Sequence, residues 1–237
     1  MSRAFVLFDL DDTILDFHKA EAVALSRTLR ELGLKPTEEI LRRYSVINRR
    51  QWELLEEKKQ TREETLTRRF DILFSEFGID CDGRLARDRY EANLAVGHCF
   101  MPGAEALLES LYGRYELFVV SNGTARVQAG RIASAGIARY FSGIFISEEL
   151  GVNKPDREFF DRCLARIPSF ERERALLVGD SLTSDIRGAR NAGLRSCWFN
   201  FRRESPRADI PADFEIHALE ELPALLERLF SACGDNN

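Results

Sequence analysis

Three carboxylates and a hydroxyl follow a short apolar run near the start of the chain. Residues 4–8 are apolar at every position, and Asp9, Asp11, Asp12 and Thr13 come directly after them. A strand without alternation is typical of a parallel sheet that is covered on both faces. Because open α/β sheets bind ligands at the carboxyl ends of their strands, this pattern predicts that Asp9 lies in a ligand-binding crevice.

The acidic residues of this run also predict a bound cation. Carboxylates packed so closely repel one another, and a divalent ion or a positively charged group must offset them. The alternative is that Asp11 and Asp12 only open a turn, since Asp is favoured in turns and helix caps. The run alone leaves both interpretations open.

Length and composition predict a globular protein that acts on a small molecule. The 237 residues are 44% hydrophobic and 31% charged, which is typical of a soluble protein with a sizeable core. The formal net charge of -5 gives no electrostatic reason to expect a nucleic acid polymer or a membrane as partner. Either a monomer or a homodimer is compatible with these features.

The cysteines and the start of the chain indicate the compartment. Cys81, Cys99, Cys163, Cys197 and Cys233 are odd in number and never spaced as C-x-x-C, which argues against a disulfide framework and a structural zinc site. No signal-peptide pattern precedes the first strand, and no apolar stretch reaches about 18 residues. We therefore expect a cytoplasmic protein with reduced cysteines.

Periodicity divides the chain into an α/β core and a helical insert. Residues 18–98 lack strand-like runs and show helical spacing, with helices expected before and after residues 58–61 and over 82–96. The charge-dense segment 48–69 alternates basic and acidic residues, as an exposed helix face does. From residue 101 onward, helices and strands alternate, which predicts right-handed crossovers in a mostly parallel sheet.

The expected fold is therefore α/β, with a Rossmann-like, mostly parallel sheet and helices on both of its faces. Residues 1–17 and 99–237 form this core, and residues 18–98 form an inserted all-helical domain. After the insert, strands are expected over 116–120, 144–146, 175–178, 195–199 and 214–216. Helices are expected over 102–113, 124–135, 155–167, 182–192 and 218–230.

Three later segments place polar groups at the same edge of the sheet as Asp9. They are Ser121-Asn122-Gly123, Lys154-Pro155, and Gly179-Asp180-Ser181 followed by Ser184-Asp185. Together with the first run, they resemble the four ordered motifs of the haloacid dehalogenase (HAD) superfamily. The resemblance covers the whole chain, because the insert is similar to the helical C1-type cap of that superfamily.

This resemblance implies a phosphatase that works through an aspartyl-phosphate intermediate. It implies that Asp9 is the nucleophile, a role in which a carboxylate splits one difficult displacement into two easier ones. Asp11 can protonate the leaving alkoxide and then deprotonate the attacking water. An acid at this position favours phosphatase over dehalogenase chemistry, because a leaving halide needs no proton.

Binding of the transferred phosphoryl group is expected from the second and third motifs. Ser121 can donate its hydroxyl, and Gly123 permits a tight turn that directs N–H groups of this segment, Asn122 included, at an anion. Lys154 offers a charge that could bridge the phosphate and the Asp9 carboxylate. For residues 121–123 alone, an ordinary capped turn between strand and helix remains an open alternative.

One Mg²⁺ per active site is expected, and Mn²⁺ is a possible substitute. Magnesium prefers octahedral oxygen ligation with few protein carboxylates, so the predicted ligands are Asp9, the Asp11 backbone carbonyl and Asp180. Asp185 is expected outside the direct ligands. Thr13 is expected to bond the backbone around the nucleophile loop.

The substrate is less clearly indicated than the reaction. Residues 101–104, 146–155 and 197–200 resemble YjjG-type pyrimidine 5′-nucleotidases, which implies nucleoside 5′-monophosphates as substrates. Phe17, Tyr44, Trp52 and Tyr90 of the insert could stack a base, although Trp52 also fits the insert's core. His18 fits either a position near the substrate or a surface position.

Several other functions remain open at this point. The enzymatic alternatives are a phosphatase for phosphoglycolate, sugar phosphates or N-acylneuraminate phosphate, and a phosphomutase. The non-enzymatic alternative is a receiver-like or inactive phosphate-binding protein. The presence of both Asp9 and Asp11 argues against an inactive protein.

Overall fold

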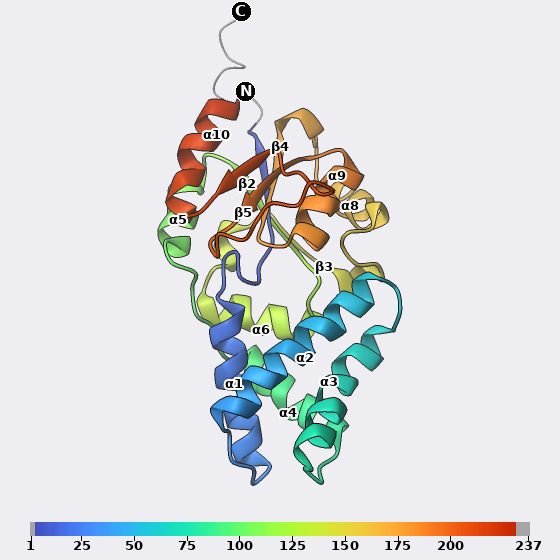
Figure 1. Ribbon diagram of the computed structural model, residues 1–237. Helices are drawn as coiled ribbons and strands as arrows, with labels where there is room; N and C mark the ends of the chain where they lie inside the picture. Colours follow the sequence, from blue (N-terminus) through green and yellow to red (C-terminus); the bar gives the residue numbers. More distant parts are fainter. Residues whose placement is uncertain (1–2, 231–237) are drawn as a thin grey trace, which may run out of the picture. The chain divides into compact units, whose positions relative to one another are not determined.

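The apolar run at the start of the chain forms strand β1 (Phe5–Phe8), which lies inside a parallel sheet. The computed structural model describes residues 3–230, and within them the sheet has six strands in the order β3-β2-β1-β4-β5-β6 (Figure 1). Every pairing is parallel. The other strands are β2 (Glu116–Ser121), β3 (Gly143–Ile146), β4 (Ala175–Gly179), β5 (Arg195–Phe199) and β6 (Phe214–Ile216).

The strand order changes direction between β1 and β4. In an open α/β sheet, the crevice outside the carboxyl ends of such a strand pair is the place where ligands bind. Asp9 follows β1 and Asp180 follows β4, so both residues lie at this point. The predicted α/β fold with a Rossmann-like parallel sheet is confirmed.

Helices cover both faces of the sheet. Helices α5 (Ala104–Leu111) and α10 (Leu222–Phe230) lie on one face, and α8 (Arg157–Leu164) and α9 (Arg187–Ala192) lie on the other (Figure 1). All four residues of β1 are buried, as two-sided packing requires. A short helix, α7 (Ser147–Leu150), follows β3 directly.

Some helix boundaries differ from the sequence-based expectation. The helix expected from Pro155 begins at Arg157, so Pro155 lies outside it. The helix expected over 182–192 begins as a π-helical turn (Leu182–Ile186), because the Ile186 N–H donates to the Ser181 carbonyl five residues earlier. Before α10, Leu219–Glu221 form a 3₁₀ turn.

A second unit of the chain is entirely helical. Contacts assign residues 17–99 and 126–135 to this helical unit, and the remaining described residues to the α/β unit. Its helices are α1 (Phe17–Glu31), α2 (Glu38–Glu56), α3 (Arg62–Phe77), α4 (Gly83–Ala95) and α6 (Ala125–Ala135). The sequence-based division placed residues 126–135 in the core, whereas they group with the helical unit.

Aromatic side chains fill the core of the helical unit. Tyr44 and Tyr90 are fully buried, with ring centroids 5.5 Å apart, and Phe70 packs against both. Two of the four aromatic residues considered for base stacking are therefore core residues. The Arg62 guanidinium lies over the Trp52 ring, 5.6 Å from the ring centre.

Two further features agree with expectations from composition. Cys81, Cys99, Cys163 and Cys197 are free thiols, while Cys233 lies outside the described residues. Among residues 3–230, no helix combines the length and the apolar character needed to span a bilayer.

Candidate active site

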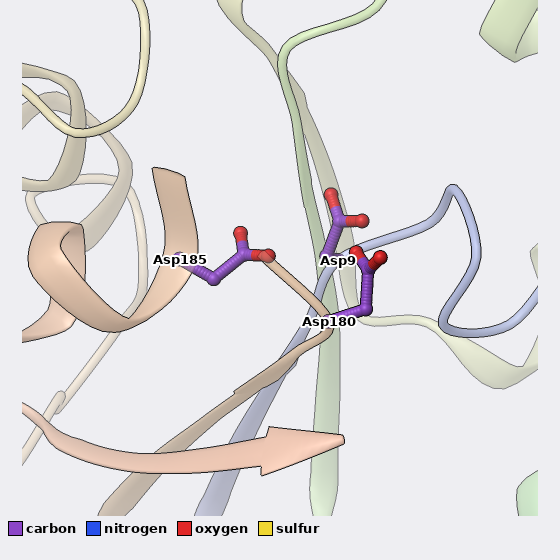
Figure 2. Close-up of side chains that lie close together, drawn as sticks. All are labelled: Asp9, Asp180 and Asp185. Atoms are coloured by element: carbon purple, nitrogen blue, oxygen red, sulfur yellow. The ribbon is translucent and has the colours of Figure 1, made fainter. Parts of the chain in front are cut away.

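Three carboxylates converge where β1 and β4 end. Oxygen atoms of Asp9, Asp180 and Asp185 all lie within 4.8 Å of one another (Figure 2). Asp9 and Asp180 come directly after their strands, and Asp185 projects from the π-helical turn that follows β4. The fold thus brings together residues that are up to about 175 positions apart in the chain because parallel strands end at one edge.

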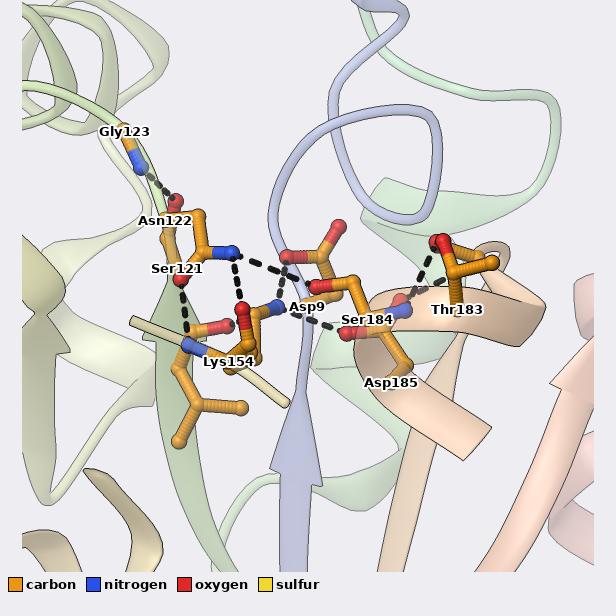
Figure 3. A network of polar contacts seen from close by, with 10 residues as sticks. Asp9, Ser121, Asn122, Gly123, Lys154, Thr183, Ser184 and Asp185 are labelled. Atoms are coloured by element: carbon orange, nitrogen blue, oxygen red, sulfur yellow. Dashed lines mark hydrogen bonds and ion pairs between the residues drawn. The ribbon is translucent and has the colours of Figure 1, made fainter. Parts of the chain in front are cut away.

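The ammonium group of Lys154 lies between two of these carboxylates. It is 1% exposed, and it donates to Asp9 Oδ1 at 2.6 Å, to Asp185 Oδ1 at 2.6 Å and to the Val120 carbonyl at 2.9 Å (Figure 3). An ammonium has three hydrogens, so each of them has an acceptor. Burial opposes its charge, but the carboxylates of Asp185 and Asp9 outweigh burial and raise the pKa of Lys154 above its ordinary value.

Negative charge nevertheless exceeds positive charge in this cluster. Burial raises the pKa of Asp9 to about 8, because the ion pair with Lys154 offsets only part of the desolvation and the carboxylates of Asp185 and Asp11 add to it. Burial and neighbouring carboxylates also raise the pKa of Asp180 well above its ordinary value. These oxygens are hard ligands whose negative charge Lys154 offsets only in part, so the donor set fits Mg²⁺.

Asp185 is oriented by its own turn. Its Oδ2 accepts the Ser181 N–H at 3.1 Å, while its Oδ1 accepts from Lys154. Gly179 leaves the room that this carboxylate occupies, since a Cβ there would lie 2.3 Å from Asp185 Oδ2. Asp185 thus supports the site through Lys154 and the backbone.

A side chain in the loop after β2 forms hydrogen bonds to the backbone of Lys154. The Asn122 side chain donates to the Lys154 carbonyl at 2.9 Å and accepts the Lys154 N–H at 2.8 Å (Figure 3). Ser121 is buried, and its hydroxyl accepts the Gly123 N–H at 3.1 Å. Asn122 was expected to bind phosphate through the backbone N–H groups of this segment. Its side chain binds the Lys154 backbone and donates to the Ser184 hydroxyl at 3.3 Å, and its backbone N–H stays a predicted phosphate ligand.

Comparison with known proteins identifies the family. Residues 6–199 match the family described as haloacid dehalogenase-like hydrolase. The chain belongs to this HAD family. The resemblance inferred from the four motifs is therefore confirmed, and the chain is a hydrolase of a family that generally uses Mg²⁺.

Several HAD relatives match this chain over nearly its whole length. The pyrimidine 5′-nucleotidase PynA of Streptococcus pneumoniae is 38% identical over 229 residues, which are 96% of this chain and 97% of that protein. The pyrimidine 5′-nucleotidase YjjG of Escherichia coli is 31% identical over 228 residues, which are 95% and 99% of the two chains. The magnesium-bound crystal structure of the HAD-hydrolase YfnB from Bacillus subtilis superposes with a TM-score of 0.91 at 38% identity, covering 95% of this chain and 99% of that one.

The remaining residues of the first HAD motif have different surroundings. Thr13 is fully buried, and its hydroxyl has no hydrogen-bond partner within residues 3–230, so the expected bond to the nucleophile loop is not formed. The loop backbone is already paired internally, because the Leu10 carbonyl accepts the N–H groups of Ile14 and Leu15. Asp11 is half-buried and forms a backbone bridge with Leu15.

Arg202 belongs to the HAD site although no motif contains it. Its Nη2 donates to Asp12 Oδ2 at 2.9 Å, and its Nη1 lies 3.4 Å from Asp180 Oδ2. Sequence reasoning missed this residue because it follows β5 as one arginine among several. The only signal in the sequence was the excess of acid, which called for a further positive charge.

Proposed function

We propose that this HAD hydrolase is a Mg²⁺-dependent 5′-nucleotidase that releases phosphate from nucleoside 5′-monophosphates, with pyrimidine nucleotides preferred. The arrangement of Asp9, Lys154 and Asp180 at one edge of the sheet supports the reaction type. The near-complete alignment with two pyrimidine 5′-nucleotidases, including the helical insert, supports the substrate class.

Asp9 supplies the nucleophile in this mechanism. Lys154 holds its Oδ1 at 2.6 Å and thereby orients the carboxylate. Attack on phosphorus forms the Asp9–phosphate bond and breaks the bond from phosphorus to the 5′-oxygen of the nucleoside. Water then attacks the same phosphorus, which releases inorganic phosphate and restores the carboxylate.

Asp11 handles the protons of both steps. It lies two residues after the nucleophile and is half-buried, so its carboxyl can reach the crevice. It gives a proton to the leaving 5′-oxygen and takes one from the attacking water. A positioned acid and base of this kind contributes roughly 10²- to 10⁴-fold to the rate.

Asp9, the backbone carbonyl of Asp11 and Asp180 would hold one Mg²⁺, and Mn²⁺ would substitute for it. When bound there, Mg²⁺ would offset the charge of these carboxylates and of the phosphoryl oxygens of a dianionic ester. Ser121 at the end of β2 would donate to a phosphoryl oxygen, and the charge of Lys154, which follows α7, would stabilise the same group.

Three supporting residues act through Lys154 and the turn. Asp185 and the Asn122 side chain fix the ammonium and the backbone of Lys154. Gly123 shapes the turn in which the Ser121 hydroxyl accepts its N–H. The phosphoryl site is therefore rigid before substrate arrives, which is where transfer of a phosphoryl group gains most of its rate.

A phosphate-release panel tests this proposal. Pyrimidine and purine nucleoside monophosphates, phosphoglycolate and sugar phosphates are compared with and without a chelator. We expect pyrimidine nucleotides to be the best substrates and the chelator to stop turnover. Asp9→Asn is expected to abolish turnover, and Asp11→Asn to lower it about 10²- to 10⁴-fold.

The matched control is Asp209→Asn, which changes an exposed aspartate paired with Arg207 and is expected to keep full activity. Strong phosphoglycolate hydrolysis with inert nucleotides would contradict the substrate class. Full turnover by Asp9→Asn would contradict the mechanism.

A further inference from the structure

Arg202 joins the two loops that carry the proposed metal ligands. Its guanidinium donates to Asp12 in the loop after β1, and it approaches Asp180 directly after β4. The same guanidinium lies 4.4 Å above the centre of the Phe201 ring. Because β1 and β4 flank the point where the sheet reverses its order, one side chain spans the crevice at its base.

The segment that carries Arg202 is itself well fixed. Asn200 donates to the Glu204 carbonyl at 2.9 Å and accepts the Glu204 N–H at 2.8 Å, which closes the turn around Arg202. On β5, the Trp198 indole donates to the Asp180 carbonyl at 2.8 Å. Strand β5 therefore supports the backbone of Asp180, and the chain after β5 supports its carboxylate.

Asp12 has an unfavourable environment and backbone conformation, which a contact with Arg202 would stabilise. It is 8% exposed, and its φ of 55° lies in the left-handed region that residues other than glycine rarely adopt. Its neighbour Asp11 carries the proposed acid and base and the backbone carbonyl of the metal site. Fixing the Asp12 carboxylate therefore fixes the backbone from which Asp11 projects.

We propose that Arg202 is a positioning residue that sets the Mg²⁺ affinity of the site by holding Asp12 and Asp180 in place. The proposal rests on the metal site of the proposed function. A contact that holds the ligands in place and an isolated positive charge have opposite effects on the Mg²⁺ affinity. A bare positive charge repels Mg²⁺, so its removal tightens binding. Loss of a contact that holds the ligands loosens them, and such outer partners are worth about 10- to 100-fold in metal affinity.

The test is titration calorimetry with Mg²⁺ on the substrate-free protein. Arg202→Met keeps the length of the side chain and removes the contact, and it is expected to bind Mg²⁺ about tenfold more weakly. Asp12→Asn is expected to weaken binding similarly. The double variant is expected to bind Mg²⁺ no more weakly than Arg202→Met does, because Arg202→Met already breaks the contact with Asp12.

The matched control is Arg207→Met, which removes an exposed arginine of the same segment and is expected to bind Mg²⁺ as the wild type does. Thermal melting in chelator checks that every variant is folded. Activity gives a second readout: Arg202→Met should need about tenfold more Mg²⁺ for half-maximal turnover.

Three results would contradict the proposed positioning role of Arg202. Unchanged or tighter binding by Arg202→Met overturns it, and so do opposite effects of the two single variants that cancel in the double variant. Both results leave the proposed function intact, because the wild type still binds Mg²⁺. A wild type that binds no Mg²⁺ contradicts the metal site of the proposed function and this inference with it.

Discussion

Lys154 shares one ammonium group among a nucleophilic carboxylate, a supporting carboxylate and a backbone carbonyl. Buried ion pairs stabilise a protein only when their geometry and their other hydrogen bonds are complete. Here all three hydrogens are used at 2.6 to 2.9 Å, and Asn122 holds the backbone of the same residue. The residue that orients Asp9 also keeps Asp9 and Asp185 together.

Lys154→Met is expected to destabilise the protein by about 3–5 kcal/mol, since it leaves two buried carboxylates without their shared cation. Phosphate release is expected to fall with it. Urea unfolding and the phosphate-release assay measure the two effects. Lys59→Met is the control, because Lys59 pairs with Glu57 on the surface, where such pairs contribute about 0–1 kcal/mol. A Lys154→Met protein as stable as the wild type would show that the cluster gives no net stability.

Among secondary structure elements, the strands were the most predictable. Each expected strand lies within one residue of an observed strand. In β1, β2 and β4 the reason is an uninterrupted apolar run, which specifies burial on both sheet faces. The start of the 182–192 helix was less predictable. Its π-helical turn depends on Asp185 fitting beside Gly179, which no local pattern contains.

The candidate site shows the same limit. Strand ends predicted that Asp9, Lys154, Asp180 and Asp185 would share an edge, and the structure brings them together. The sequence motifs could not predict the contact between Arg202 and the Asp12 carboxylate, which lies 190 positions earlier in the chain. Only the folded chain shows which side chains meet across such a separation.

The helical segment 48–69 was only partly predictable. Exposed ion pairs such as Arg50 with Glu53 fit the expected solvated face. The two ends of the segment differ, because Asn48 and Arg69 are buried and bonded to each other at 3.0 Å. Asn48 also donates to Glu21 at 2.7 Å, so one chain of hydrogen bonds links α1, α2 and α3.

Asn48→Leu keeps the approximate side-chain volume and removes both of these hydrogen bonds. We expect a loss of about 2–3 kcal/mol in the free energy of unfolding, since hydrogen bonds to charged groups are worth about 1.5–3 kcal/mol. The midpoint of urea unfolding measures it. Arg49→Ala on the exposed face of α2 is the control and should stay within about 0.5 kcal/mol. An unchanged midpoint for Asn48→Leu would mean that the buried bonds add no stability.

Across the molecule as a whole, the described cysteines form two groups, one buried and one half-buried. Burial raises the pKa of Cys163 and that of Cys197 to about 12, because desolvation disfavours the thiolate. Cys81 and Cys99 are only half-buried. Since the thiolate is the reactive form, burial protects Cys163 and Cys197 both by disfavouring ionisation and by blocking access.

Alkylation of the native protein at about pH 9 is therefore expected to modify Cys81 and Cys99 and to leave Cys163 and Cys197 intact, because the latter two are fully buried and burial raises their pKa. Peptide mass spectrometry reads out each site. In urea all four should react, which serves as the control. Rapid native modification of Cys163 would show that the sheet and α8 open well below global unfolding.

Helix α6 shows how closely the helical unit depends on a later part of the chain. Val127 belongs to the apolar core of that unit, a Cβ on Gly130 would lie 2.5 Å from the Ala95 carbonyl oxygen, and the Ser134 hydroxyl donates to the Val96 carbonyl. The insert between the first two motifs is therefore not a self-contained cassette. Grafting residues 17–99 onto another HAD scaffold would leave their core without its partner helix, so a transfer of the helical unit has to include residues 126–135 as well.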